Sequence, residues 1–372
     1  MVKRRLQTGF VGLPNVGKST LFNVLVGGTQ ADAQNFPFCT IDANVGFSLI
    51  PDSRLDALAK LSKSEKVTEA SLTYVDIAGL VEGASEGNGL GNQFLADIRN
   101  CDAIVQAVRC FDKEKKDIIH VLEGDIDPVR DIAVINNELL LADLAQLEKR
   151  LQKIKKKGDL KEIEAVQTLI EQLENGVAAR ETRENWSNEV SSVVKTLGLI
   201  TAKPMIYAAN VGEDDIADPF ANEEVLALRD SVADEDSIVV PVSAQLECEL
   251  NDLDNLEERS DYLEALGITE KDTAKHRLTC ATNELLNLQV FYTTGDTESR
   301  AWQCRKGITA PSAAGIIHTD FEKKFIRAEC VSYDDLISFG SLHAAKENGR
   351  VRAEGKDYIV CDGDVMLFRH GA

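Results

Sequence analysis

The sequence lacks the residue spacings that mark metal-binding and membrane-spanning proteins. Its eight cysteines include no CxxC pair and its five histidines no HxxxH spacing, so no zinc site is expected. No run of about 18 apolar residues is present, so we expect no membrane-spanning helix. The basic N-terminus is not followed by the apolar run of a signal peptide. Cysteines scattered in a chain of 372 residues are typical of reduced thiols, so we expect a cytoplasmic protein.

Positive charge is also scarce. The chain has 41 Lys and Arg against 62 Asp and Glu, a net charge of −21. Such an excess argues against a protein that binds phosphate backbones over its whole surface. The acidity is not uniform, however, because residues 198–280 contain 20 acidic and 6 basic side chains, which is two-thirds of the net charge. The other parts of the chain are therefore not excluded from contact with nucleic acid.

The clearest motif lies near the N-terminus, where Gly12–Ser19 reads GLPNVGKS and fits the pattern GxxxxGK(S/T). A strand is predicted over Leu6–Val11, and a helix starts after the motif. Glycines allow backbone N–H groups to surround a phosphate, Lys18 can reach the β- and γ-phosphates, and the Ser19 hydroxyl can bind Mg²⁺. We assign to nucleotide binding the residues Asn15, Val16, Gly17, Lys18, Ser19 and Thr20.

Two further segments can complete a Mg²⁺ site. An apolar strand over Leu72–Asp76 ends in the motif DxxG, in which Asp76 can hold the shell of the ion and the Gly79 N–H can contact the γ-phosphate. Between these motifs, Thr40 supplies a hydroxyl that can join the shell when a triphosphate is present. The predicted metal-binding residues are therefore Ser19, Thr40 and, through the outer shell, Asp76.

Two later strands end in loops that follow in the order expected of a G domain. The strand that begins at Pro204 continues into NxxE, and the strand that begins at Ile238 continues into SAQ. A P-loop, a threonine, DxxG and these two loops in this order predict a doubly wound α/β sheet. The predicted base-reading residues are Asn210, Val211, Glu213, Ser243, Ala244 and Gln245.

The first of these loops favours adenine over guanine. In the usual guanine reader NKxD, the aspartate accepts hydrogen bonds from guanine N1–H and the 2-amino group, whereas here Val211 and Glu213 replace the lysine and the aspartate. A glutamate is one methylene longer, and adenine offers no donor at N1 or C2. Asn210 can still reach N7, and Val211 can pack on the ring. The sequence therefore predicts a preference for ATP, with GTP bound at lower affinity.

The residue that orients the attacking water in many GTPases is a glutamine directly after DxxG, and here it is Leu80. Leucine cannot orient water, so either hydrolysis is very slow or another group takes this role. His120, in a charged stretch after a predicted strand, is one candidate. The alternative is that His120 is an ordinary surface residue of a loop.

These motifs resemble the YchF subgroup of Obg-related P-loop NTPases, the Obg-like ATPases, nearly end to end. The matching stretches include GFVGLPNVGKSTLFN, NFPFCTIDANVG, DIAGLVEGAS and KGITAPSAAGIIHTDFEKKFIRAE. The resemblance implies ATP binding and hydrolysis, Mg²⁺ dependence, a cytosolic location and association with ribosomes. It also implies a hydrophobic residue at the glutamine position, matched by Leu80, and a catalytic histidine, matched by His120. Asn15 matches an asparagine that accompanies K⁺ stimulation in related NTPases, so K⁺ is a second cofactor hypothesis.

A helical insertion is expected over about 129–197. Apolar residues alternate in steps of four and three along residues 140–154 and 163–177, so two helices joined at Gly158–Asp159 should form an antiparallel coiled-coil hairpin. The tip of this hairpin, residues 149–161, carries seven basic side chains and one acidic. It is either a solvated face or a contact for the phosphates of ribosomal RNA.

The end of the chain alternates apolar strands with turns, which predicts a small β-grasp fold that resembles a TGS domain. Strands are expected at 288–293, 325–331, 358–361 and 364–368. The expected domains are a nucleotide-binding domain over 1–128 and 198–280, the helical hairpin over 129–197, and the TGS domain over 283–370.

The predicted function is an Mg²⁺-dependent ATPase switch whose nucleotide state controls binding to the ribosome. We expect a monomer without membrane contact that binds ribosomal RNA through the hairpin tip and the TGS domain. Two alternatives stay open. One is a nucleotide-gated ribosome- or protein-binding regulator whose hydrolysis is incidental, and the other is a translation-associated GTPase that prefers GTP.

Overall fold

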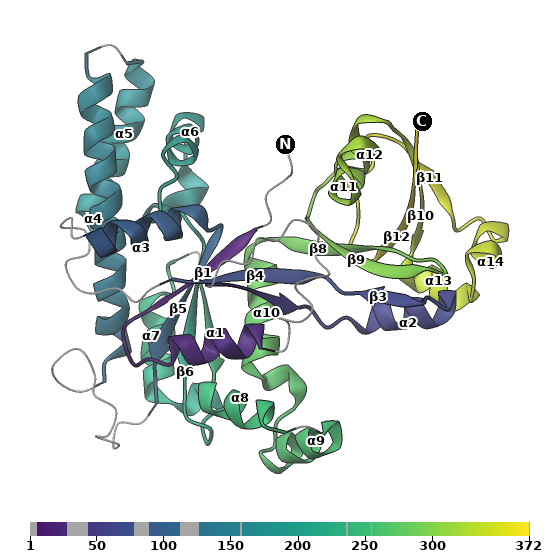
Figure 1. Cartoon of the computed structure of the whole chain (residues 1–372). Helices are drawn as coiled ribbons and strands as arrows, with labels where there is room; N and C mark the ends of the chain where they lie inside the picture. Colours follow the sequence, from purple (N-terminus) through teal and green to yellow (C-terminus); the bar gives the residue numbers. More distant parts are fainter. Residues whose placement is uncertain are drawn as a thin grey trace. The chain divides into compact units, whose positions relative to one another are not determined.

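The computed structural model describes residues 6–27, 44–77, 89–111, 126–156, 158–235, 237–253 and 255–371 (Figure 1). The chain divides into two compact units. The P-loop unit is formed by Leu6–Phe47 and Thr73–Leu285, and the C-terminal unit contains Ser48–Leu72 and Leu286–Ala372.

The P-loop unit is built on a six-stranded sheet with the order β2-β4-β1-β5-β6-β7. All the pairings among β4, β1, β5, β6 and β7 are parallel. Parallel strands are usually covered by helices on both faces, and accordingly every residue of β5 and β6 is buried. The strands are β1 (Gln7–Gly12), β2 (Val45–Leu49), β4 (Ser71–Asp76), β5 (Ala103–Arg109), β6 (Met205–Asn210) and β7 (Ser237–Val242). This order confirms the predicted doubly wound sheet.

Helices and short 3₁₀ turns surround this sheet and form the hairpin. The α-helices are α1 (Lys18–Val26), α3 (Gly89–Asn100), α4 (Pro128–Ile154), α5 (Leu160–Glu174), α6 (Asn188–Leu197), α7 (Glu223–Ser231), α8 (Ala244–Asn251), α9 (Leu256–Ala265) and α10 (Ala274–Leu285). The 3₁₀ turns are η3 (Ala179–Asn185), η4 (Pro219–Ala221) and η5 (Glu270–Asp272).

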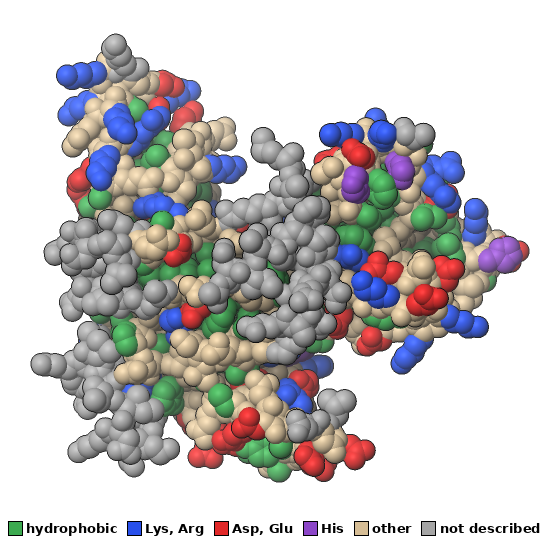
Figure 2. All heavy atoms as spheres, viewed as in Figure 1, with side chains coloured by type: hydrophobic (Ala, Val, Ile, Leu, Met, Phe, Trp, Pro, Cys, Tyr) green, Lys and Arg blue, Asp and Glu red, His purple; other side chains and the backbone are tan. Residues whose placement is uncertain are grey.

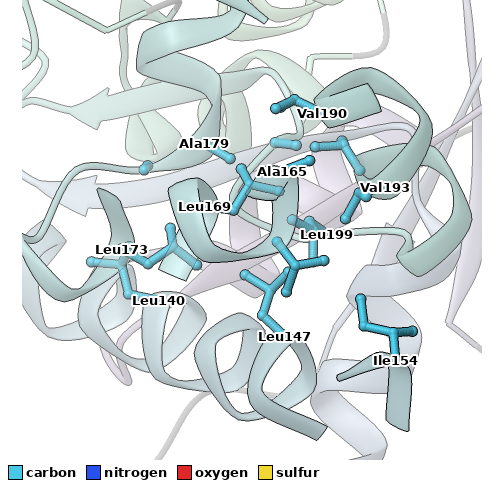
Figure 3. Packing of buried hydrophobic residues seen from close by; sticks show 14 residues of the cluster. Leu140, Leu147, Ile154, Ala165, Leu169, Leu173, Ala179, Val190, Val193 and Leu199 are labelled. Atoms are coloured by element: carbon cyan, nitrogen blue, oxygen red, sulfur yellow. The ribbon is translucent and has the colours of Figure 1, made fainter. Parts of the chain in front are cut away.

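Helices α4 and α5 form the hairpin that the apolar spacing predicts (Figure 1). Figure 3 shows buried side chains of this hairpin, among them Leu147 of α4 and Leu169 of α5. Both are 0% exposed and belong to a cluster that also includes residues of α6. The second helix is shorter than the predicted seam. It ends at Glu174, because Gly176 adopts a left-handed conformation with φ 78° and reverses the chain before Val177.

The C-terminal unit contains a mixed six-stranded sheet with the order β11-β10-β12-β8-β9-β3. Strands β8 and β12 are parallel neighbours in its middle, and β9 and β10 pair with them antiparallel on either side, as in a β-grasp fold. The strands are β3 (Lys66–Thr68), β8 (Leu288–Thr293), β9 (Glu298–Arg305), β10 (Phe325–Ser332), β11 (Arg352–Glu354) and β12 (Asp364–His370). The helices of this unit are α2 (Ser53–Ser62), α11 (Ala310–Ile317), α12 (Thr319–Lys323), α13 (Tyr333–Phe339) and α14 (Leu342–Glu347).

The predicted strands of this unit differ from the observed ones in two ways. The strand expected at 358–361 is wrong, because Ile359 makes only one isolated bridge, to Thr309. Strands β3, β9 and β11 are not among the predicted strands, and in β9 half-exposed residues alternate with buried ones and so give no apolar run. Its partner β8, by contrast, is buried over most of its length, and the sequence predicts this strand.

The segment Ser48–Leu72 joins the C-terminal unit although it lies between two strands of the first sheet. Its strand β3 pairs in parallel with β9, and Leu55 and Leu58 of α2 are buried in a cluster that includes Tyr292. The N-terminal end of α2 is held by Asp52, which accepts a hydrogen bond from the backbone of Arg54. The domain boundaries predicted from the sequence include residues 48–72 in the nucleotide-binding domain, because nothing in the composition of this segment separates it from the flanking strands.

Candidate nucleotide-binding site

The P-loop connects the end of β1 to the start of α1, and its shape requires small residues at two positions. A Cβ atom on Gly12 would lie 3.1 Å from the Ala107 carbonyl oxygen. Gly17 has φ 89°, and a Cβ there would collide with the Asn210 side chain. The backbone can therefore turn tightly before α1 begins at Lys18, which places the N-terminal N–H groups of the helix at the loop.

The structure brings together the predicted phosphate-binding lysine and the predicted metal-binding carboxylate. The Lys18 ammonium forms an ion pair with the Asp76 carboxylate, and the two side chains are 11% and 25% exposed. This contact is possible because β4 lies next to β1 in parallel register, with Asp76 opposite Phe10. Ser19 follows Lys18 in the first turn of α1 and is exposed. Three of the predicted residues thus lie at one edge of the sheet.

Asn210 links the P-loop to the loop after β7. Its Nδ2 donates to the Val16 carbonyl at 3.0 Å, and its Oδ1 accepts from the Ala244 N–H at 2.9 Å. The residue is 3% exposed, so both hydrogen bonds are shielded from water. Val211 is 2% exposed, which leaves little of its side chain to pack against a base. Asn210 therefore fixes the relative positions of two predicted nucleotide-binding loops.

The SAQ segment begins helix α8. Ser243 is the residue before the helix, and its hydroxyl accepts a hydrogen bond from the Leu246 N–H at 3.3 Å. At 1% exposure this side chain is a helix cap within the core. Gln245 is exposed, and its Nε2 donates to Glu249 at 3.0 Å on the same helix.

Glu213, which takes the place of the guanine-reading aspartate, is held by a tyrosine that the sequence analysis missed. The Tyr262 hydroxyl lies 2.6 Å from Glu213 Oε1 and also hydrogen-bonds the Glu249 carboxylate. These two hydrogen bonds raise the pKa of Tyr262 above its usual value, and the bond from Tyr262 lowers the pKa of Glu249. No sequence motif connects these residues, since Tyr262 lies on α9, 49 residues after Glu213.

Three predicted site residues lie outside the described residues. They are Thr40, Gly79 and His120, and Leu80 of the glutamine position lies outside them as well. Among the described residues, no helix is both long enough and apolar enough to cross a membrane.

The hairpin tip carries exposed basic side chains (Figure 2). Arg150 pairs with Glu162 across the hairpin, with its Nε 2.9 Å from Oε1, and Lys161 pairs with Glu189 at 3.7 Å. Among the described residues, the exposed lysines on the last turns of α4 and just beyond it are Lys149, Lys153, Lys155 and Lys156.

The strand order, the P-loop geometry and the Asn210 bridge define a P-loop nucleotide-binding protein of the G-domain class. Comparisons with known proteins agree with this class. A family model described as a 50S ribosome-binding GTPase matches residues 7–138. A second model, YchF-GTPase_C, described as a protein of unknown function (DUF933), matches residues 288–371.

Curated relatives extend over nearly the whole chain. The "Ribosome-binding ATPase YchF" of Bacillus subtilis is 46% identical over 98% of this chain and 99% of its own length. The protein of the same name from Haemophilus ducreyi is 49% identical over 97% and 98% of the two chains. The "Obg-like ATPase 1" of Rattus norvegicus is 42% identical over 98% of this chain and 92% of its own. The chain belongs to the YchF family of Obg-like ATPases, as its motifs indicate.

A solved structure shows the same architecture. The YchF GTPase of Schizosaccharomyces pombe matches with a TM-score of 0.85 and 35% identity, covering 98% of both chains. A GTP-binding protein from Pyrococcus horikoshii matches with a TM-score of 0.60 at 21% identity, which shows a shared fold. The predicted fold class is therefore confirmed over the whole chain.

Proposed function

We propose that this protein is an Mg²⁺-dependent P-loop ATPase whose nucleotide state controls its binding to the ribosome. The observation that carries the proposal is the ion pair between Lys18 and Asp76 at the edge of a G-domain sheet. The proposed base-reading loop of this sheet has Glu213 in place of the usual aspartate. Full-length relatives named ribosome-binding ATPases support both the activity and the partner.

The oxygen donors at this edge suit Mg²⁺. The ion prefers oxygen ligands and usually keeps several waters, so the Ser19 hydroxyl is proposed as a direct ligand beside the phosphates, and the Asp76 carboxylate as an outer-shell group that holds one of these waters. Asp76 lies within reach of the P-loop, because it contacts Lys18. When bound, the ion would neutralise charge on the β- and γ-phosphates. Thr40 is proposed as a further ligand, and Asn15 as the residue that supports stimulation by K⁺.

The base-reading loop supports ATP as the preferred nucleotide. Asn210 Nδ2 carries a second hydrogen besides the one donated to Val16, and this hydrogen can be donated to N7 of a purine. Since N7 is present in both adenine and guanine, Asn210 does not discriminate between them. Discrimination falls to Glu213, the only carboxylate in the NxxE motif.

Hydrolysis is proposed to depend on His120. Leu80 cannot orient water, so another polar group must do so, and the family resemblance assigns this role to His120. Replacing His120 with alanine should abolish ATP turnover while leaving the Kd for ATP unchanged. If ribosome binding still responds to ATP in this variant, hydrolysis is incidental and the protein is a nucleotide-gated binding protein.

The hairpin tip is proposed to contact ribosomal RNA, with the C-terminal unit as a second contact. The exposed lysines at the tip can replace counterions along a phosphate backbone. We also propose that the protein is a monomer. Because its proposed partner is the ribosome, we propose that it is located in the cytoplasm.

Equilibrium titration of the full chain with ATP and with GTP, each with Mg²⁺, tests the proposal. ATP should bind more tightly, and Lys18→Ala should weaken the binding of both nucleotides. A tenfold preference for GTP would overturn our interpretation of Glu213.

A further inference from the structure

The carboxylate of Glu213 is part of a hydrogen-bonded cluster that joins three elements. We name this cluster the carboxylate clamp. Tyr262 of α9 donates to Glu213 in the loop after β6 at 2.6 Å, and it also contacts Glu249 of α8. Gln245 donates to Glu249 at 3.0 Å from the first turn of α8. The clamp consists of Glu213, Gln245, Glu249 and Tyr262.

A single hydroxyl holds two carboxylates in this clamp. Tyr262 has one proton to donate, so Glu213 and Glu249 share the same donor. Two carboxylates that approach one hydroxyl oxygen also approach each other, and their like charges repel. Without the Tyr262 hydroxyl, this repulsion would move Glu213 away from Glu249. The hydroxyl therefore stabilises the close approach of the two carboxylates.

The position of Glu213 matters because its chemistry suits guanine. A carboxylate accepts two hydrogen bonds from the N1–H and 2-amino groups of guanine, whereas adenine offers no donor at these positions. The extra methylene of glutamate does not by itself prevent this contact, since a side chain with three torsions can reach one target in several rotamers. A preference for ATP therefore requires a contact that keeps the Glu213 side chain out of the rotamers in which its carboxylate faces the base.

We propose that Tyr262 is a specificity-determining positioning residue, whose hydroxyl holds Glu213 against α8 and α9 and thereby withholds from guanine the carboxylate that would bind it. The proposal deepens the proposed ATP preference and depends on it. Adenine loses nothing when Glu213 is held, because it has no donor for a carboxylate. Tyr262 acts through Glu213 and needs no contact with the nucleotide.

The test is a pair of equilibrium titrations, with ATP and with GTP, on the full chain carrying Tyr262→Phe. This change removes the hydroxyl and keeps the ring. Freed from the clamp, Glu213 can accept hydrogen bonds from guanine, and a charged hydrogen bond corresponds to about a 10-fold gain in affinity. The Kd for GTP should therefore fall about 10-fold, while the Kd for ATP stays within about 2-fold. Lost packing or partial unfolding would not tighten the binding of one nucleotide.

Three further variants identify the cause of the change. Adding Glu213→Gln to Tyr262→Phe should return the Kd for GTP to the wild-type value, because the amide cannot accept both guanine donors as the carboxylate does. Glu249→Gln should keep the wild-type preference, since its amide can accept from Tyr262 and adds no repulsion. Tyr333→Phe removes a tyrosine hydroxyl from α13 of the other unit and should change neither Kd.

The outcomes separate this inference from the proposed function. If the wild-type chain prefers ATP and Tyr262→Phe leaves the ratio of the two Kd values unchanged, the inference is overturned and the proposed function stands. Equal weakening of both nucleotides would show that Tyr262 only supports the fold, and this also overturns the inference. If the wild-type chain itself prefers GTP, the proposed ATP preference fails first, and the inference fails with it.

Discussion

At the scale of single residues, the side chains of the candidate site are bonded to one another across different loops. Lys18 at the start of α1 pairs with Asp76 at the end of β4, and Asn210 joins the P-loop to the start of α8. Glu213 is held by a residue of α9. Each substitution at these positions therefore changes a connection between elements of the fold.

Lys18→Ala should lower ATP turnover by about 100-fold or more, because it removes the ammonium that we propose stabilises charge on the transferred phosphoryl group. It also leaves the Asp76 carboxylate without its ion-pair partner. Phosphate release measured at saturating ATP gives the result. Lys60→Ala, an exposed lysine at the end of α2, is the matched control and should retain full turnover. Turnover of more than a tenth of wild type in Lys18→Ala would contradict this role.

Asn210→Ala should lower the free energy of unfolding by about 1–3 kcal/mol, since the Val16 carbonyl and the Ala244 N–H lose their buried partner. Urea unfolding of the apo protein measures this change. Asn210→Asp keeps an acceptor for Ala244 but loses the donor to Val16, so its stability should be intermediate. An alanine variant as stable as wild type would show that the bridge does not hold the loops.

At the scale of elements, the hairpin is an apolar seam with a basic end. The seam is buried between α4, α5 and α6, and the basic side chains lie where the chain reverses (Figures 2 and 3). Packing and charge thus occupy different residues of the same helices. Each can be changed separately.

Leu169→Ala should destabilise the hairpin by about 2–5 kcal/mol, because this side chain is 0% exposed and its loss leaves a cavity. The change can be followed with Trp186, which packs against the same cluster, in a chain where the only other tryptophan is replaced by Trp302→Phe. Leu141→Ala, on the exposed face of α4 at 51% exposure, is the control and should shift stability by less than about 0.5 kcal/mol. Similar losses in the two variants would contradict the seam.

Replacing Lys149, Lys153, Lys155 and Lys156 with glutamine should weaken binding to ribosomes and lower its salt dependence. Each lysine that contacts a phosphate contributes about 0.9 to the slope of log K against log salt, so the slope should fall by up to about 3.6. Sedimentation with ribosomes at several salt concentrations measures it. ATP turnover of the free protein should not change. The variant Lys271→Gln/Lys275→Gln, in the acidic part of the chain, is the control and should keep the wild-type slope.

At the scale of the whole molecule, neither of the two units is formed by one continuous segment of the sequence. The chain leaves the P-loop unit after Phe47, returns at Thr73 and leaves again after Leu285. The described residues of the C-terminal unit therefore come from two separate stretches of the sequence. Asp52 connects them, since it accepts hydrogen bonds from Arg54 of α2 and from the Tyr292 hydroxyl of β8.

The stability of the C-terminal unit should fall in acid because of Asp52. Burial opposes ionisation of this carboxyl, but the hydrogen bonds from Arg54 and Tyr292 outweigh burial and lower its pKa below the usual value. A carboxyl with a lowered pKa stabilises the fold above its unfolded-state pKa of about 4, and this contribution is lost as the pH falls through the folded-state pKa. Asp52→Asn should therefore be less stable than wild type near pH 7, and the difference should shrink towards about pH 3.

Urea unfolding between these pH values, followed by the fluorescence of Trp302, measures this difference. Trp186→Phe in both proteins makes Trp302 the only tryptophan, and Trp302 lies in β9 of the C-terminal unit. A constant difference between the two proteins at all pH values would show that Asp52 does not titrate with the fold.

The sequence by itself determined the parts of the molecule that depend on local spacing. The P-loop requires glycines and a lysine at fixed intervals, the hairpin requires apolar residues every three or four positions, and buried parallel strands require continuous apolar runs. These patterns located Lys18, Asp76 and Asn210 and predicted both the doubly wound sheet and the hairpin. Each pattern is contained in a short segment, so it can be recognised without knowledge of the rest of the chain.

Only the tertiary structure decided which distant segments meet. The pairing of β3 with β9 joins residues more than 200 positions apart, and the contact of Tyr262 with Glu213 has no counterpart in any motif. Strand β9 was missed for a related reason, because a half-exposed strand is stabilised by its neighbours and need not be apolar throughout. Such contacts depend on how whole elements pack, and packing is a property of the folded chain rather than of any one segment.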